Sequence, residues 1–423
     1  MDARPASWSP PADGTRAAVA AVAATLAFAT AWVAVHYGFY GRNDIVDTPL
    51  YQRYGDAIVD GHVPYRDFTV EYPPAALPAF VLPSLLVPHA SRHAYDLVFG
   101  LLMAACGAAA VALVAVVLAC EGAGTIRLVA GCGLAALAPL ALGSVLLTRF
   151  DLWPVALTVA ALAALVAGRD RLALGALGLA VAAKIYPLVL IPVFAAHVWK
   201  RRGRRRALAA VAVAVAVAAA CALPFLALAP HGTWESSLRQ TARPLQIETL
   251  GAGILLALHQ ALGLHVVERT SYGSQNLAGS LPDALTAAQA VLQALALLAV
   301  WVWFARGPAS RERLFRACAA AVCAFMVFNK VLSPQFLVWL VPLVALVRGR
   351  RGLAAGALLA AALVLTQLWF PHRYWALALR FDPLGSWLVL ARNLVLLGLL
   401  GALALPQRTG LAARAARLPP AAP

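Results

Sequence analysis

Six carboxylates are concentrated in one short stretch of the chain, residues 43–72, which reads NDIVDTPLYQRYGDAIVDGHVPYRDFTVEY. The whole chain has only 18 acidic residues, and the six in this stretch are Asp44, Asp47, Asp56, Asp60, Asp67 and Glu71. The stretch directly follows an apolar segment that is long enough to cross a bilayer. Membrane insertion does not require such a cluster, so it indicates chemistry, and we expect one of these carboxylates to act as a general base.

Lysines are rare in this chain, and two of them lie in apolar surroundings. Of the 34 basic residues only Lys184, Lys200 and Lys330 are lysines. An ionised lysine at bilayer depth costs about 3 kcal/mol, so Lys184 and Lys330 each need a cavity, water or an anion. One interpretation is that both side chains reach up to the membrane interface. The other, which we favour because the two segments are similar, is that each compact ammonium group binds a phosphate.

Other polar side chains lie beside the apolar segments, and together with the acidic loop they would form a polar chamber on one face of the membrane. A tyrosine in this region either stacks on a sugar or belongs to the aromatic belt of the interface. We expect Arg243 to join the two lysines at a phosphate. The residues expected to contact the rest of the substrate are Tyr51, Arg66, Glu71, Arg149, Asp151, Tyr186, Gln246, Glu248, Gln335 and His372.

The composition defines the class of protein that must position these groups. The 423 residues are 62% hydrophobic and only 12% charged, and the mean hydropathy is +0.79. A soluble domain cannot bury that much apolar surface, so we predict an all-α polytopic membrane protein. The net charge of +16 comes from short cationic runs between apolar segments, at residues 200–206, 311–316 and 348–351. That distribution sets membrane orientation and argues against nucleic-acid binding.

Cofactor motifs are not found in the sequence. The six cysteines form no CxxC pair and read as small packing residues. The histidine spacing of a zinc site, the phosphate-binding loop and the dinucleotide-binding glycine pattern are also missing. We therefore predict no cofactor and no metal site, with a divalent ion at Asp44 and Asp47 as the open alternative.

The apolar segments predict about twelve membrane crossings, with both termini in the cytoplasm. Residues 1–16 form an N-terminal tail, residues 17–405 the membrane-embedded domain and residues 406–423 a basic C-terminal tail. Within the domain we expect an external loop at 38–74 and an external segment at 230–282. We read the first apolar run, 17–37, as an uncleaved span rather than a signal peptide.

Two segments are predicted to enter the membrane and return as hairpins of short helices. Arginines on both sides of residues 172–199 indicate the same, inner side of the membrane, although one straight span would separate them. The turn falls at Lys184-Ile-Tyr-Pro187, where proline disfavours a continuous helix. Arginines also flank residues 317–347, whose middle reads Asn329-Lys-Val-Leu-Ser-Pro-Gln335. Lys184 and Lys330 are thus the predicted hairpin tips, and both face the outer side.

In their order along the chain, these segments resemble the integral-membrane glycosyltransferases of the C superfamily. They are most similar to the bacterial polyprenol-phosphate-mannose-dependent α-1,2-mannosyltransferases. The segments that carry the resemblance are Asp47–Tyr51, Gly61–Pro74, Arg149–Asp151, Lys184–Pro187, Arg243–Glu248 and Asn329–Gln335. The resemblance implies a catalytic aspartate in the first external loop, with Asp47 as the best match and Asp44 as the alternative. It also implies a polyprenyl-phosphate sugar donor, with mannose as the expected sugar.

The expected reaction follows from the charges. The cations of Lys184, Lys330 and Arg243 would balance the leaving phosphate, while the aspartate accepts a proton from the acceptor hydroxyl. Direct displacement inverts the sugar carbon. The acceptor would be a glycolipid or a glycan, at the outer face of a bacterial plasma membrane and among membrane lipids. The main alternative is a transporter or flippase of a lipid-linked substrate, which also needs broken helices and intramembrane charges. A ligase or polymerase of envelope glycans is a third reading.

Overall fold

The structure is a computed structural model that describes residues 14–38 and 45–405. The described part is almost entirely helical, as predicted, with one small sheet. The helices are α1 (Gly14–Tyr37), α2 (Thr48–Val59), α3 (Leu77–Leu86), α4 (Arg92–Cys120), α5 (Thr125–Leu142), α6 (Leu152–Val166), α7 (Asp170–Ala183), α8 (Ile191–Arg202), α9 (Arg204–Leu228), α10 (Pro230–Thr241), α11 (Leu250–Leu262), α12 (Ser280–Arg306), α13 (Arg311–Val327), α14 (Val341–Ala345), α15 (Gly349–Gln367), α16 (Tyr374–Arg380) and α17 (Pro383–Ala404). The strands are β1 (Leu245–Gln246), β2 (Val267–Ser271) and β3 (Ser274–Ala278).

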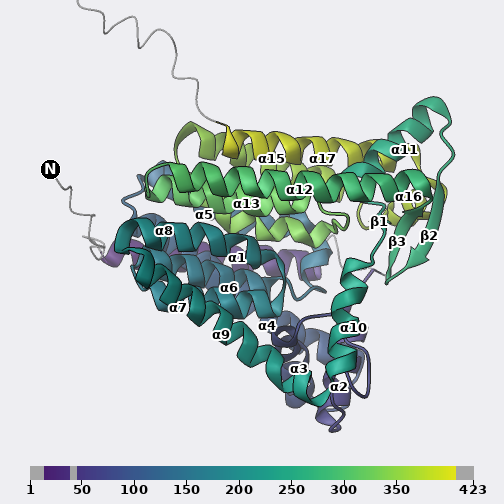
Figure 1. The fold of residues 1–423 in the computed structure, drawn as a ribbon, viewed down its shortest axis with the longest axis horizontal. Coiled ribbons are helices and arrows are strands. Elements are labelled where there is room, and N and C mark those ends of the chain that lie inside the picture. The colour runs from purple at the N-terminus through teal and green to yellow at the C-terminus, as the bar shows by residue number, and fades with distance from the viewer. Residues whose placement is uncertain (1–13, 39–44, 406–423) are drawn as a thin grey trace, which may run out of the picture.

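The helices lie roughly parallel in two groups (Figure 1). One group contains α12, α13, α15 and α17, and the other contains α6, α7 and α9, while α10 crosses from the second group toward the sheet at one end. Helix α13 lies at the centre, and its residues are buried from Leu314 to Ala324 and again at Met326 and Val327. Its neighbours surround it, so its sequence needs no polar face.

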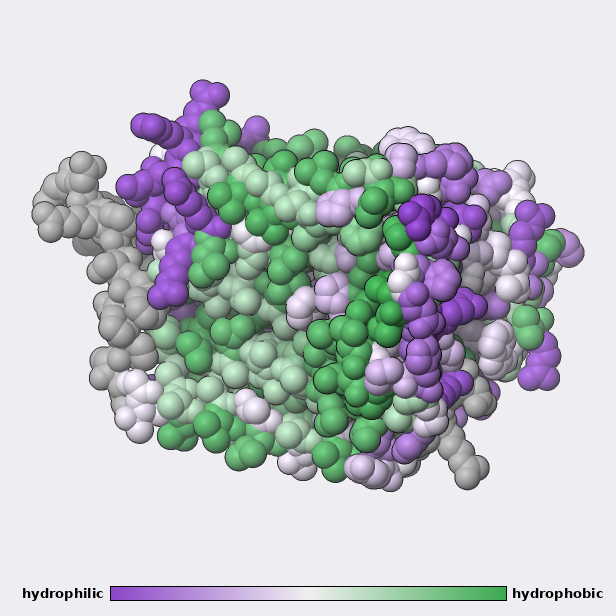
Figure 2. Space-filling model, turned by 90° about the horizontal axis from the view of Figure 1, so that it is seen from below, coloured by the Kyte–Doolittle hydropathy of each residue, from purple (hydrophilic) through white to green (hydrophobic). Residues whose placement is uncertain are grey.

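Seven of the described helices are long and apolar enough to cross a membrane: α1, α4, α5 with its continuation to Leu146, α9, α12, α15 and α17. Shorter apolar helices, such as α6 and α11, lie among them. Figure 2 shows the corresponding hydrophobic belt between two hydrophilic ends. The chain is therefore a multi-pass membrane protein. The total of about twelve crossings stays a prediction.

Both predicted hairpins are present, because the two ends of each segment meet. Asp170 begins α7 and Arg202 ends α8, and their side chains form an ion pair at 3.2 Å. Arg311 and Arg348, on either side of the second segment, both pair with the Glu121 carboxylate. The turns that carry these residues form what we call the arginine-rich end of the molecule.

Each hairpin tip contains a proline after the first helix has ended. Helix α7 ends at Ala183, and Lys184 is extended, with φ −157° and ψ 142°. Pro187 then lies near the start of a short 3₁₀ helix. In the second hairpin, Pro334 begins a 3₁₀ helix after α13 has ended. Because proline has no N–H and clashes with the carbonyl four residues earlier, Pro187 accounts for the end of α7 at Ala183. In the second tip α13 ends at Val327, well before Pro334, so the proline there starts the next element and does not end the helix.

The small sheet was not predicted. Strand β3 pairs with β1 on one side and with β2 on the other, and all pairs are antiparallel. A two-residue turn joins β2 to β3, and both Tyr272 and Gly273 have positive φ angles (53° and 66°), as tight hairpin turns require. The register sets Gln246 of β1 opposite Asn276. The sheet thereby holds Gln246 at the end of the molecule opposite the arginine-rich end.

Candidate functional site

Asp47 lies directly before α2, and its side chain does not cap that helix. Instead it forms an ion pair with Arg149 and accepts a hydrogen bond from the Tyr51 hydroxyl at 3.3 Å. Tyr51 is itself fixed by stacking on Phe80, with ring centroids 4.3 Å apart. The Asp47 side chain remains 32% exposed, so its carboxylate is held in place but can be reached from outside. Asp44, the alternative base, lies outside the described residues.

A buried ion pair lies beside Asp47, at the first hairpin tip. Lys184 Nζ is 2.7 Å from Asp151 Oδ1, and the Trp339 indole donates a hydrogen bond to the same oxygen at 2.7 Å. The Asp151 side chain is 1% exposed and that of Lys184 is 14% exposed. The ammonium group also lies 4.5 Å from the centre of the Phe150 ring. Because Asp151 balances its charge, Lys184 attracts a further anion less strongly than a free lysine would.

The second hairpin tip carries a different set of cations. Lys330 Nζ donates a hydrogen bond to the backbone oxygen of Thr241 at 2.5 Å. Arg243 donates to the backbone oxygen of Tyr272 at 2.8 Å and lies 3.5 Å from the Glu71 carboxylate. Burial lowers the pKa of Lys330, and the nearby Arg243 lowers it further. Both cations line an open cavity of about 460 Å³ against α12.

Gln246 links the sheet to the second hairpin. Its side chain accepts a hydrogen bond from the backbone N–H of Leu332 at 2.8 Å, and donates to Ser333 at 3.2 Å and to Glu248 at 2.6 Å. Glu248 is fully buried, and burial raises the pKa of its carboxyl group to about 8. Burial therefore favours the neutral form of this carboxyl group.

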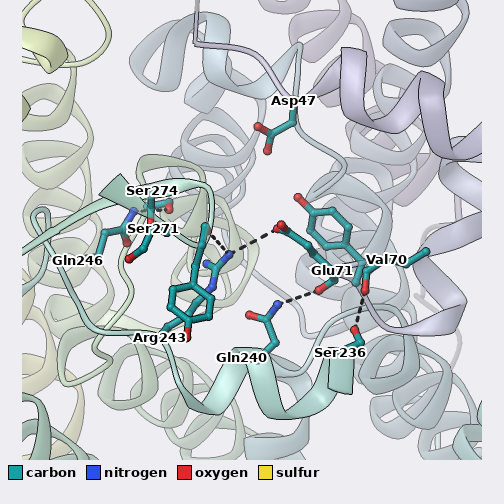
Figure 3. Close-up of polar contacts among 12 residues, drawn as sticks. Asp47, Val70, Glu71, Ser236, Gln240, Arg243, Gln246, Ser271 and Ser274 are labelled. Atoms are coloured by element: carbon teal, nitrogen blue, oxygen red, sulfur yellow. Dashed lines mark hydrogen bonds and ion pairs between the residues drawn. The ribbon is translucent and has the colours of Figure 1, made fainter. Parts of the chain in front are cut away.

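Helix α10 fastens the acidic loop over this region (Figure 3). Ser236 donates a hydrogen bond to the backbone oxygen of Val70 at 2.6 Å, and Gln240 donates to that of Glu71 at 2.9 Å. In the close-up, Arg243 lies between Gln246 and Glu71, to which a dashed line joins it, and Asp47 lies on the far side of the open space above them. The two hairpin tips, the sheet and the acidic loop thus lie at one end of the molecule.

The predicted site residues do not all join this arrangement. Arg66 is exposed and pairs with its neighbour Asp67 at 2.8 Å, and His372 is exposed in the loop before α16. Gln335 is buried beside the second tip, while the Tyr186 ring stacks on Trp339 at 4.3 Å. The substrate contacts of these four residues, like those of all the other predicted site residues, stay predictions.

Sequence reasoning missed Arg392, which lies fully buried in α17. Its guanidinium group donates a hydrogen bond to the backbone oxygen of Glu248 at 2.6 Å and lies 5.9 Å from the Trp369 ring centre. The signal was an arginine inside a membrane-length apolar helix, a position where charged residues are rare and usually have a partner or a function. Within the described ranges, no three His, Cys, Asp or Glu side chains converge as a metal site would require. Metal independence stays a prediction.

The comparisons with known proteins agree with this architecture. The profile of glycosyltransferase family 87 matches residues 68–334, which is well over half of the chain. The match includes both hairpin tips and the sheet, but it begins after Asp47. No curated protein matches the chain. The match supports sugar transfer and lends no support to the transporter or flippase alternative. On this evidence the chain belongs to glycosyltransferase family 87 and is a multi-pass membrane glycosyltransferase.

Proposed function

We propose that this glycosyltransferase moves a sugar, with mannose as the first candidate, from a polyprenyl-phosphate donor to a hydroxyl group of a glycolipid or glycan. The reaction takes place on the extracytoplasmic side of a bacterial plasma membrane, and both termini lie in the cytoplasm. The observation that carries the proposal is the Asp47 carboxylate. It is held by Arg149 and Tyr51, partly exposed, and lies at the same end of the molecule as the cationic cavity of Arg243 and Lys330.

In the proposed reaction Asp47 accepts the proton of the acceptor hydroxyl as its oxygen attacks the anomeric carbon. The bond from that carbon to the donor phosphate breaks, and its electron pair stays on the phosphate oxygen. Polyprenyl phosphate leaves with one more negative charge than the donor carried at that oxygen. Fixed cations near the phosphate stabilise this developing charge without having to reorganise. Because the attack is direct, the configuration at the anomeric carbon inverts.

The cationic cavity supports entry of the donor from the membrane. Besides Arg243 and Lys330, its lining includes Asp283, Ala287 and Gln293 of α12, so two cations face one carboxylate and the lining carries a net charge of about +1. Only 17% of the most apolar stretch of α12 is buried within the protein, so the rest of this stretch is available to lipid. A polyprenyl chain can therefore lie along α12 while its phosphate reaches the two cations. Lys184, whose charge Asp151 balances, would act nearer to Asp47 than Arg243 and Lys330 do.

Purified protein supplied with polyprenyl-phosphate mannose and a glycolipid acceptor tests the proposal, with release of polyprenyl phosphate as the readout. We expect Asp47→Asn to bind the donor normally but to lose about 10²- to 10⁴-fold in transfer, the usual contribution of general base catalysis. Asp60→Asn is the matched control, because Asp60 lies in the same acidic stretch but pairs with His89 at 3.2 Å, and it should transfer normally.

Three other results would change the assignment. Full transfer by Asp47→Asn would remove this residue as the base and make Asp44 the candidate. Retained configuration at the transferred sugar, measured by NMR of the product, would exclude a single displacement. Movement of the lipid-linked sugar across sealed vesicles without any transfer would favour a flippase.

A further inference from the structure

A second cationic cavity, of about 510 Å³, lies at the arginine-rich end, away from Asp47 and the hairpin tips. It forms where the start of α7 faces the turn between α8 and α9. Its lining contains four arginines and one acid: Arg169, Arg171, Arg202, Arg206 and Asp170. Its volume falls within the roughly 300–1,000 Å³ of small-ligand pockets.

The charges in this cavity are unbalanced. Asp170 pairs with Arg202 at 3.2 Å. In the part of the chain that the structure describes, the other three arginines have no acidic partner, so the lining carries a net charge of about +3. Like charges held this close repel one another, and a bound anion would relieve that repulsion. The guanidinium group, with its fork of N–H donors, matches a phosphate in particular.

The cavity adjoins a surface that faces lipid. Leu172, in its lining, is 56% exposed, and Leu208 on the neighbouring turn of α9 is 58% exposed. Only 6% of the apolar core of α9 is buried within the protein, so this helix presents most of its surface to lipid chains. An anion in the cavity would thus lie at the boundary between the polar end and the hydrophobic belt.

Membrane orientation alone does not account for the cavity. Positive charges near the ends of spans set orientation wherever they lie, including on exposed turns. Arg204 and Arg205 belong to the same cationic run and are exposed, as the arginines of the cavity are, but they do not line it. The grouping of Arg169, Arg171 and Arg206 around one hollow is a separate feature.

We propose that this cavity binds the phosphate head group of an anionic phospholipid, whose acyl chains lie along α9. Basic pockets at the membrane boundary favour such lipids, because the Coulomb attraction to the head group adds to the apolar contact of the chains. The site is independent of the sugar-transfer reaction, and its occupancy would anchor the base of the first hairpin.

The full-length protein in detergent, titrated with phosphatidylglycerol or phosphatidylcholine, tests the site by native mass spectrometry and by thermal unfolding. The test variant is R169Q/R171Q and the matched control is R204Q/R205Q, since each removes two positive charges from the same end. We expect wild type and control to bind phosphatidylglycerol at least tenfold more tightly than phosphatidylcholine. The test variant should lose that preference while it unfolds, without lipid, at the temperature of the wild type.

Three outcomes would overturn the proposal. An equal loss in test and control variants would assign the preference to general surface charge. An equal affinity of the wild type for the two lipids would show that the head-group charge is not recognised. Binding of glycerol phosphate as tight as that of phosphatidylglycerol would make the cavity a site for a soluble phosphate.

Discussion

Replacing Lys184 by methionine leaves the buried Asp151 carboxylate without an ion-pair partner at 2.7 Å. For unit charges at this distance, and an effective dielectric constant of about 20, Coulomb's law gives an attraction of about 6 kcal/mol. The cost of desolvating both groups offsets part of it, and breaking a buried pair on one side typically costs about 3–5 kcal/mol. Since Trp339 still donates a hydrogen bond to Asp151, we expect a loss of about 3 kcal/mol in the free energy of unfolding.

The double variant K184M/D151N removes both charges and keeps the shapes similar. We expect its stability to be close to that of the wild type, because exchanging a buried pair for neutral groups is often neutral. Thermal unfolding of the wild type, the two single variants and the double variant gives the coupling energy as a double-mutant cycle. Binding of the polyprenyl-phosphate donor and of the acceptor is then measured for each protein.

The double variant separates two roles of Lys184. If the lysine also binds the donor phosphate, the stable double variant will bind donor weakly and acceptor normally. Wild-type transfer by the double variant would refute that role and reduce Lys184 to balancing the charge of Asp151. A double variant as unstable as the lysine variant would refute the reasoning about charge itself.

Three further predictions concern other parts of the molecule. Burial raises the pKa of Glu248 to about 8 from 4.5, so between these pH values the folded protein holds a proton that the unfolded chain has released. The free energy of unfolding should therefore fall as pH rises toward and through 8. The Glu248→Gln variant should lack this decline when its thermal unfolding is measured from pH 6 to 9. A Cβ atom at Gly232 of α10 would lie 1.8 Å from the backbone oxygen of Tyr65, so Gly232→Ala should displace α10 and lower the transfer rate. Gly133→Ala is the control: no atom lies within 4 Å of a Cβ at that position, and the transfer rate should not change. Glu121→Gln weakens the charged contacts that close the second hairpin and should cost about 2 kcal/mol in thermal unfolding; an unchanged melting temperature would contradict that role.

Long-range features of the fold were readable in the sequence where charge and length left one solution. The arginines on both sides of residues 172–199 required a return of the chain, and the ion pair between Asp170 and Arg202 confirms it. The partner of Lys184 was not readable, because Asp151 lies 33 residues earlier and only the packing of α6 against α7 brings the two together.

The sheet and the buried arginine show two other reasons for failure. Strands β2 and β3 are short and flank a Tyr-Gly turn, a pattern whose signal was weak beside the long apolar helices. Arg392 donates a hydrogen bond to the backbone oxygen of Glu248, which is 144 residues away in the sequence. A local sequence pattern cannot predict such a contact. Asp47 was chosen by resemblance, and its role as the base awaits the transfer assay.

Each hairpin runs from a base at the arginine-rich end of the molecule to a tip at the end that carries Asp47. Each base is closed by an acid, Asp170 in the first hairpin and Glu121 in the second. The opposite ends carry Lys184 and Lys330, which are held by Asp151 and by the backbone oxygen of Thr241. A change in the ion pairs at a base would tilt the hairpin and so move the lysine at its tip, where the position of the positive charge matters most. Substitutions at the arginine-rich end, at the opposite end of the molecule from Asp47, should therefore change turnover without touching any reacting group.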